Sequence, residues 1–186
     1  MTTIYFIRHA QSDFSVIDDR TRPLTDKGIA DCKLVTNFLH DKEIDIVLSS
    51  PYKRAVDTIK DFADTVKLPI KTVEDFRERD HVFVDDWRAL VEKQWEDFTY
   101  SDPGDESLMD TQKRNISALN DAISLYKNKN IVIGTHGTAL STIINYFDAT
   151  YGFNDFMKMV FLTPWVVKMV FKENACISIE KINLFD

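Results

Sequence analysis

A short apolar segment near the start of the chain ends in two residues that are costly to bury. Residues 4–7 read Ile-Tyr-Phe-Ile, and this mixture of β-branched and aromatic side chains is typical of a buried strand. Arg8 and His9 follow at once, and both lose solvation in a protein interior unless they find partners. Because ligands of open α/β sheets bind at the carboxyl ends of strands, we expect Arg8 and His9 to lie in a site there.

The remaining chain alternates two kinds of apolar pattern. Helical spacing alternates with short apolar runs, and a hairpin-like pair at residues 166–171 and 176–182 ends the chain, with β structure expected over 158–183. This order predicts an α/β fold in one domain over residues 1–186: a three-layer sandwich with a mostly parallel sheet and an antiparallel edge. The other predicted strands are 44–48, 68–73 and 130–134, and the predicted helices are 25–41, 51–66, 85–98, 106–126 and 138–147.

Charge and cysteine content exclude several classes of protein. The net charge is −7 and no Lys/Arg run occurs, so we expect neither a nucleic-acid nor a membrane partner. No apolar run reaches membrane-spanning length and no basic leader precedes the first strand, which favours the cytoplasm. Cys32 and Cys176 are far apart and fit neither a metal motif nor a disulfide framework, so both are expected to be plain thiols.

A second strand end brings another histidine. Residues 130–134 are followed by Thr135-His136-Gly137, and Arg54 lies in the first turn of the helix after the 44–48 strand. If these strands are neighbours, two imidazoles and two guanidinium groups meet, together with helix amino termini after residues 25, 50 and 137. Arginine binds phosphate oxygens bidentately. The expected ligand is a small molecule carrying a phosphoryl group.

Such a pocket favours covalent phosphoryl transfer. A neutral imidazole can attack phosphorus while the cations stabilise the equatorial oxygens. A carboxylic acid must then protonate the leaving alkoxide. Glu78 is the first candidate, because it follows the third strand at the same sheet edge. Its neighbours Arg77 and Arg79 would favour the ionised form, so an acid role requires them to point away. The other carboxylates considered are Asp75, Asp80, Asp85 and Glu106.

The sequence resembles the histidine phosphatase superfamily, also called the phosphoglycerate mutase-like family. The resemblance rests on collinear motifs between residue 4 and about residue 140. They are Phe6-Ile7-Arg8-His9-Ala10-Gln11-Ser12, Leu24-Thr25-Asp26-Lys27-Gly28, Ser49-Ser50-Pro51-Tyr52-Lys53-Arg54-Ala55-Val56-Asp57-Thr58, Phe76-Arg77-Glu78, Gly104-Asp105-Glu106-Ser107 and Thr135-His136-Gly137.

The resemblance implies a role for each matched residue. His9 would be the phosphorylated nucleophile and Glu78 the proton donor, without a metal or another cofactor. The remaining site residues would bind the phosphorylated substrate: Arg8, Gln11, Ser12, Arg54, His136 and Gly137. Ala10 stands where the family has glycine, which is tolerable if its φ is negative. The run after Glu78 also departs from the family, and the extra segments of the longer mutases are missing, so a phosphatase is favoured over a mutase.

Other interpretations remain open from the sequence alone. A non-catalytic binder of phosphorylated ligands would keep the same arginines. A metal-dependent hydrolase would use His9, Asp13, His81, Asp85 and His136, although their spacing matches no compact metal motif. Substrate specificity is expected to lie in residues 13–22 and 79–106, where His81 could line the pocket. The aromatic residues Trp87, Trp95 and Phe98 form either core or an apolar wall for the substrate. The oligomeric state is not predicted.

Overall fold

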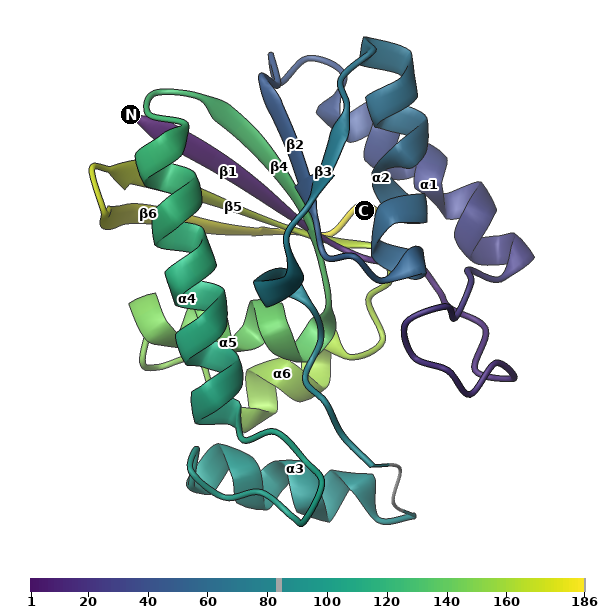
Figure 1. The fold of residues 1–186 in the computed structure, drawn as a ribbon, viewed down its shortest axis with the longest axis vertical. Coiled ribbons are helices and arrows are strands. Elements are labelled where there is room, and N and C mark those ends of the chain that lie inside the picture. Colours follow the sequence, from purple (N-terminus) through teal and green to yellow (C-terminus); the bar gives the residue numbers. More distant parts are fainter. Residues whose placement is uncertain (83–84, 186) are drawn as a thin grey trace.

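The protein contains one six-stranded mixed sheet with helices on both faces (Figure 1). The computed structural model describes residues 1–82 and 85–185. The strands are β1 (Thr2–Arg8), β2 (Ile46–Ser49), β3 (Ile70–Thr72), β4 (Asn130–Thr135), β5 (Trp165–Lys172) and β6 (Ala175–Ile182).

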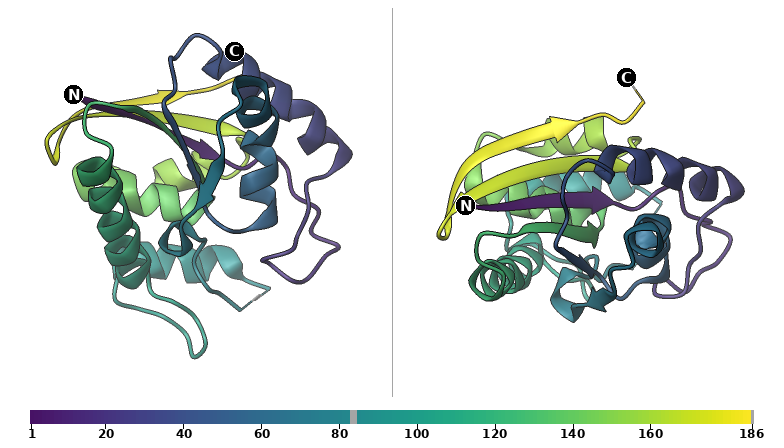
Figure 2. Two further views of the ribbon diagram at one scale, coloured as in Figure 1. Left: turned by 45° about the horizontal axis from the view of Figure 1, so that its top comes forward. Right: turned by 90° about the horizontal axis from the view of Figure 1, so that it is seen from above.

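The strand order is β3-β2-β4-β1-β5-β6. The first four are parallel, while β5 runs antiparallel to β1 and β6 antiparallel to β5. This confirms the predicted α/β sandwich with an antiparallel edge. Figure 2 shows the β5–β6 hairpin along that edge, with its tip near the N-terminus. The tip therefore lies at the end of the sheet opposite to the carboxyl ends of the parallel strands.

Side-chain alternation in the central strands divides the core into two layers. Ile4 and Phe6 face one large cluster, while Tyr5 and Ile7 face the other. Because successive side chains of a strand point to opposite faces, each face needs its own helices, and α1 and α2 cover the Tyr5 face (Figure 1). The helices are α1 (Asp26–Leu39), α2 (Lys53–Val66), α3 (Trp87–Glu96), α4 (Leu108–Leu125), α5 (Gly137–Phe147) and α6 (Phe153–Met159), with one 3₁₀ turn, η1 (Glu74–Phe76).

The structure corrects one segment of the prediction. Residues 158–164 were expected to be β structure, but α6 includes Lys158 and Met159, and β5 begins only at Trp165. Helix α6 has seven residues, too few to give a recognisable helical period. Its apolar contacts are tertiary, since Phe156 and Met159 are buried in the core of the α4–α5 face. Packing rather than local pattern therefore specifies this helix.

Gly28 explains how the first helix reaches the end of β1. A Cβ atom at Gly28 would lie 2.2 Å from the backbone oxygen of Gln11, so only glycine permits this approach. Thr25 caps α1 by accepting the N–H of Gly28 at 3.0 Å. Within residues 1–82 and 85–185, no helix combines the length and the apolar character that crossing a membrane requires.

Candidate active site

Three neighbouring strands end at the same place. Arg8 of β1 lies opposite Thr135 of β4, and Ser49 of β2 lies opposite Gly134. The next residues continue this register, because the His9 N–H donates to the Thr135 carbonyl at 3.0 Å. The imidazole rings of His9 and His136 consequently meet edge to face, with their centroids 5.3 Å apart.

The His9 ring is held in one tautomer. Its Nδ1 lies 2.7 Å from the carbonyl oxygen of Ala10, and a carbonyl can only accept, so Nδ1 carries the hydrogen. Burial, with Arg54 and Arg8 nearby, lowers the pKa of His9 well below its ordinary value. The ring is therefore neutral at neutral pH, with an unprotonated Nε2. Ala10 is not among the residues with positive φ, which satisfies the condition set by its place in the motif.

His136 lies behind His9 and is fully buried. Its Nε2 is 2.7 Å from the Ser50 hydroxyl, and the Tyr52 ring packs against it at 5.1 Å between centroids. Its Nδ1 has no hydrogen-bond partner among the described residues. Burial, followed by Arg54 and His9, lowers the pKa of His136 well below its ordinary value. Two neutral imidazoles thus stand side by side.

Arg8 connects the strand end to the segment after α6. Its Nη1 donates to the carbonyls of Met159, Val160 and Leu162 at 2.7, 3.1 and 3.0 Å. These carbonyls lie at or just past the carboxyl end of a helix, where a cation is favoured. Burial lowers the Arg8 pKa to about 10, which leaves the group charged. A Cβ on Gly137 would lie 3.2 Å from Arg8 Nε, so the missing side chain lets the start of α5 approach this guanidinium closely.

Arg54 is held by the loop between β1 and α1. Its Nη2 lies 3.1 Å from Asp19 Oδ2, and its Nη1 also donates to the Asp19 carbonyl. Asp19 pairs at the same time with Arg22, whose Nη1 is 2.7 Å away. The carboxylate of Asp19 therefore occupies the position of an anion between two guanidinium groups.

Glu78 lies at the amino terminus of α5, directly beyond His136. Its Oε2 accepts the N–H of Thr138 at 3.0 Å. Its Oε1 accepts the N–H groups of Ala139 at 3.0 Å and of Arg79 at 2.9 Å. The N–H groups of Thr138 and Ala139, in the first turn of α5, therefore bind a carboxylate of the protein itself. The same bonds fix the carboxyl group beside His136.

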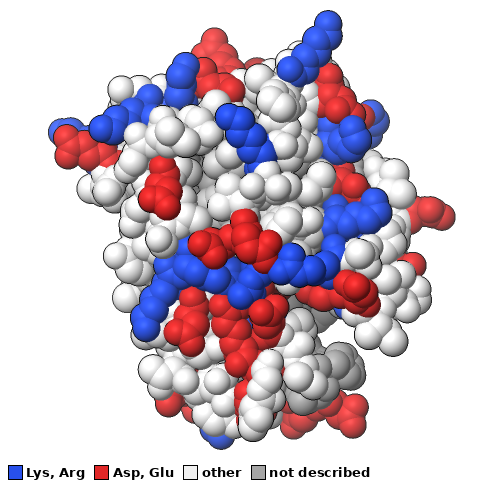
Figure 3. Space-filling model, viewed as in Figure 1, with Lys and Arg blue, Asp and Glu red and all other residues white. Residues whose placement is uncertain are grey.

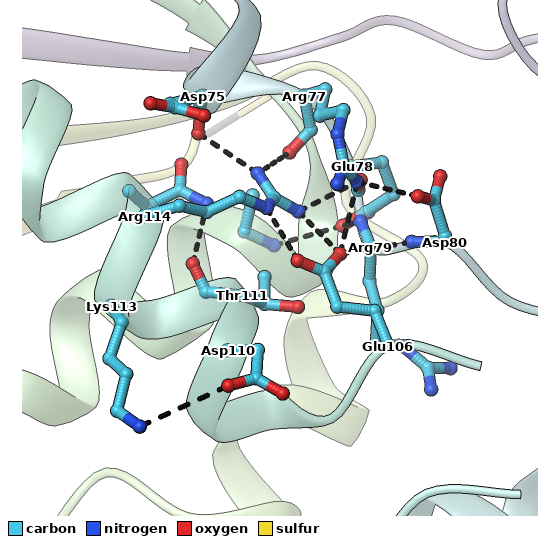
Figure 4. Close-up of polar contacts among 12 residues, drawn as sticks. Asp75, Arg77, Glu78, Arg79, Asp80, Glu106, Asp110, Thr111, Lys113 and Arg114 are labelled. Atoms are coloured by element: carbon cyan, nitrogen blue, oxygen red, sulfur yellow. Dashed lines mark hydrogen bonds and ion pairs between the residues drawn. The ribbon is translucent and has the colours of Figure 1, made fainter.

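A charged network holds the backbone of Glu78 from behind (Figure 4). Arg114 of α4 donates to the carbonyls of Arg77 at 2.8 Å and Glu78 at 3.0 Å, and both Glu106 oxygens bind Arg114 at 2.6 and 2.8 Å. Arg77 also binds Glu106, at 3.0 Å, and so points away from the Glu78 carboxylate. Figure 3 shows basic and acidic side chains mixed in one band across this face.

Arg8, His9, Arg54 and Glu78 line a cavity of about 330 Å³. Of the five carboxylates considered from the sequence, all within the described residues, Glu78 alone lines it. Among the predicted binding residues, Arg8, Ser12, Arg54 and Gly137 line the cavity, whereas His136 is fully buried and is not part of the lining. Gln11 is placed differently: it is exposed, and its Oε1 accepts the Thr25 hydroxyl at 2.9 Å. The lining side chains are those of Arg8, His9, Ser12, Phe14, Asp19, Arg22, Arg54, Glu78, Arg79, His81, Val82, Trp87, Leu90, Val91, Thr138, Phe156 and Val160, with Gly137 contributing backbone.

Comparison with known proteins agrees with this arrangement. The family model described as "Histidine phosphatase superfamily (branch 1)" matches residues 4–183. The chain belongs to this superfamily. The resemblance to this superfamily, which the sequence showed in six motifs including those of His9 and His136, is therefore confirmed.

Relatives of this superfamily member include proteins of several organisms. The uncharacterized phosphatase PhoE of Bacillus subtilis is 29% identical over 150 residues, which cover 77% of this chain and 76% of that protein. Bacillus stearothermophilus YhfR has a TM-score of 0.76 at 21% identity, covering 95% and 94% of the two chains. Entamoeba histolytica phosphoserine phosphatase in complex with 3-phosphoglyceric acid has a TM-score of 0.74 at 21% identity, covering 99% of each. The two structures show that the fold is shared.

Some lining residues were not singled out from the sequence. Asp19, Arg22 and Phe14 come from the irregular 13–22 loop, and Arg79 from the charge cluster after Glu78. Both segments were expected to carry specificity, but no local pattern tells which side chain turns inward. The two tryptophans for which core and apolar wall were both considered have different positions. Trp95 packs against Phe98, Tyr151 and Phe156 in the core, whereas Trp87 lines the cavity.

The metal-dependent alternative finds no support in the geometry. Throughout the part of the chain that the structure describes, no three His, Cys, Asp or Glu side chains gather so as to hold a metal ion. Arg8 and Arg54 also line the cavity beside His9, where their charge would oppose a bound cation.

Proposed function

We propose that the protein is a phosphatase that hydrolyses phosphomonoesters through a phosphohistidine on His9, without a metal. The observation that carries the proposal is the state of His9. Its Nδ1–H is bound by the Ala10 carbonyl at 2.7 Å, and the ring is kept neutral beside two buried guanidinium groups. A neutral imidazole with a free Nε2 in a cationic cavity is a nucleophile suited to a phosphate dianion.

The first step forms a bond from Nε2 of His9 to phosphorus and breaks the bond from phosphorus to the ester oxygen. Arg8 and Arg54 stabilise the negative charge on the non-bridging oxygens, together with His136. For Arg54 this requires the phosphoryl group to displace or share the Asp19 carboxylate. The phosphoryl group is then held on His9, and the alkoxide must receive a proton.

Glu78 supplies that proton and later takes one from water. Each carboxyl oxygen has two lone-pair sites, so Glu78 can hold a proton while it still accepts the N–H groups of Thr138 and Ala139. After the alcohol leaves, the carboxylate removes a proton from water, and the hydroxide attacks phosphorus. The bond to Nε2 then breaks, and inorganic phosphate and neutral His9 are restored.

Two alternatives share most of this site. A mutase would return the phosphoryl group to a second hydroxyl of a substrate instead of to water. A non-catalytic binder would hold the phosphate ester without forming the phosphohistidine. Phosphatase names among the relatives, PhoE and phosphoserine phosphatase, favour hydrolysis.

Rapid-quench labelling tests the proposal. A phosphomonoester labelled with ³²P should give an acid-labile, base-stable protein adduct that maps to His9, and inorganic phosphate should be the product with or without a chelator. The His9→Ala protein should give neither. Retention of more than about a tenth of the wild-type rate by His9→Ala would show that another group is the nucleophile, since a lost covalent nucleophile costs orders of magnitude.

A further inference from the structure

Arg79 is a buried cation that the proposed chemistry does not use. Its side chain is 7% exposed and lines the cavity. Its backbone N–H donates to Glu78 Oε1 at 2.9 Å, so Arg79 follows directly on the proposed proton donor. The proton donor must reach the ester oxygen of the substrate. The Arg79 side chain therefore belongs to the part of the cavity that meets the leaving group.

Two nitrogens of the Arg79 guanidinium make no hydrogen bond with the described residues. Nε and Nη1 are both inaccessible and have no hydrogen-bond partner among the described residues. The Asp105 carboxylate, with a side chain 1% exposed, approaches Nη1 only to 3.5 Å. A buried donor without a partner is costly, by about 1–3 kcal/mol. Such a group is expected where a ligand completes the bonds.

The neighbouring arginines show the contrast. Arg77 and Arg114 stand in the same charge cluster, and both bind Glu106 at hydrogen-bond distance. Figure 4 shows Arg77 and Arg114 within the dashed network around Glu106. The cluster thus contains two arginines hydrogen-bonded to Glu106 and one, Arg79, whose Nε and Nη1 make no hydrogen bond and whose ion pair with Asp105 is 3.5 Å long.

The rest of this flank is apolar. Trp87, Leu90 and Val91 of α3 line the cavity, with Phe156 and Val160 from α6 and the residues after it. Trp87 keeps 39% of its surface exposed, so the wall is open on one side. A carbon skeleton can pack against these side chains while a charged substituent reaches Arg79. The apolar wall and the Arg79 cation together favour a leaving group that is partly apolar and bears a negative charge.

We propose that Arg79 recognises a second anionic group on the substrate, a carboxylate or a further phosphate carried by the leaving group. The protein would then select phosphomonoesters of anionic alcohols over those of neutral ones. This rests on the proposed function for the identity of the phosphoryl end. The fork of arginine binds either anion bidentately, so the shared chemistry is that of a compact oxyanion.

A matched set of three-carbon ligands tests the selection. The probes are propyl phosphate, 3-phosphooxypropanoate and propane-1,3-diyl bisphosphate, which differ in the group at the far carbon. Wild-type kcat/KM should be at least about tenfold higher for one or both anionic probes, and Arg79→Gln should lower it about 10- to 150-fold for those alone. The preferred probe identifies carboxylate or phosphate. Equal rates for all three probes, or equal losses in the variant, would overturn the proposal.

Controls separate selection from folding. Arg79→Gln leaves Asp105 buried beside a neutral group, so the double variant Arg79→Gln/Asp105→Asn and the charge-retaining Arg79→Lys accompany it, with melting temperatures recorded. Arg88→Gln removes an exposed guanidinium on α3 that lies outside the lining residues. It should not change the ratio of kcat/KM for the anionic probes to that for propyl phosphate. Arg79→Lys should recover part of the preference, because it keeps the charge and loses the fork.

Calorimetry on His9→Asn protein makes the outcome independent of turnover. Binding of the anionic probes should be tighter than that of propyl phosphate, and this difference should vanish in His9→Asn/Arg79→Gln. If the wild type hydrolyses none of the probes but the binding difference is present, the proposed function fails and the recognition by Arg79 stands. If binding shows no difference, the recognition fails whatever the turnover.

Discussion

The Asp19 carboxylate lies against the Arg54 guanidinium, with Oδ2 3.1 Å from Nη2. Asp19 also binds Arg22 at 2.7 Å, and its side chain is 28% exposed. It belongs to an irregular loop, whereas Arg54 is fixed in the first turn of α2. The protein thus places an anion of its own against the guanidinium that the proposed function assigns to the phosphoryl group.

Removing this internal anion should strengthen phosphate binding. Asp19→Asn keeps the backbone carbonyl that also binds Arg54 but removes the competing charge. We expect the inhibition constant of inorganic phosphate to fall by about three- to tenfold, corresponding to roughly 1 kcal/mol. Asp13→Asn, in the same loop and hydrogen-bonded to Ser15, serves as control. Weaker phosphate binding by Asp19→Asn would mean that Asp19 orients Arg54 rather than competes for it.

Glu78→Gln should separate substrates by their leaving groups. The variant cannot donate a carboxyl proton, so kcat for alkyl phosphates should fall by about two to four orders of magnitude. The decrease in kcat for p-nitrophenyl phosphate should be much smaller, because the nitrophenolate leaving group departs without protonation. One amide N–H group of α5 also loses its acceptor, which should cost about 1 kcal/mol of stability.

Asp80→Asn is the control for Glu78→Gln, since Asp80 is exposed and lies outside the cavity lining. An equal effect of Glu78→Gln on both kinds of substrate would transfer the proton-donor role to another group. Phosphate binding should persist in both variants, because neither removes a cation.

Arg114 should act through the position of Glu78. It holds the Asp75, Arg77 and Glu78 carbonyls at 2.8–3.0 Å without reaching the cavity lining. Arg114→Ala should lower the free energy of unfolding by about 3 kcal/mol, because Glu106 keeps one partner fewer. It should also lower kcat for alkyl phosphates more than for aryl phosphates, with KM little changed.

The neighbouring Lys113 provides the comparison for Arg114. Lys113→Ala removes an exposed ammonium 3.9 Å from Asp110 and should alter neither stability nor kcat. Arg114→Lys should restore charge toward Glu106 but not the bonds to three carbonyls, and so recover activity only in part. Parallel losses for both substrate types would reduce Arg114 to a purely structural residue.

Stability should fall with acidification in a range set by the two histidines. Burial lowers the pKa of both His9 and His136 below the ordinary value of 6.5. Below pH 6.5 the unfolded chain therefore binds protons that the folded protein does not. The free energy of unfolding should decrease as pH falls, by up to about 1.4 kcal/mol per pH unit for each ring, and should show no such contribution above about pH 7.

Urea titrations between pH 5 and 8 measure this dependence. The range lies above the ordinary titration of Asp and Glu, so the carboxylates contribute little to the slope. His9→Asn should reduce the slope of the free energy of unfolding against pH by about the contribution of one imidazole ring. A slope that is flat in the wild type below pH 6.5 would contradict the buried, neutral state of the two histidines.

The local patterns of the chain were enough to predict the architecture and the strand ends that bring His9 and His136 together. Strand β1 has a continuous apolar run that ends at Arg8-His9, and β4 has another that ends at Thr135-His136. A continuous apolar run predicts a buried strand from the sequence alone, and therefore also predicts which residues lie at the end of that strand.

Tertiary structure alone decided which charges face the cavity and which support it. Arg77, Arg79 and Arg114 are the same residue type, yet two bind Glu106 and the third has only a 3.5 Å ion pair with Asp105. The side chain of Gln11 turned to Thr25, and α6 formed because Phe156 and Met159 found a core to enter. Such outcomes depend on partners distant in sequence. A flexible charged side chain takes the direction in which its ion pairs and hydrogen bonds are best satisfied, and those partners exist only after folding.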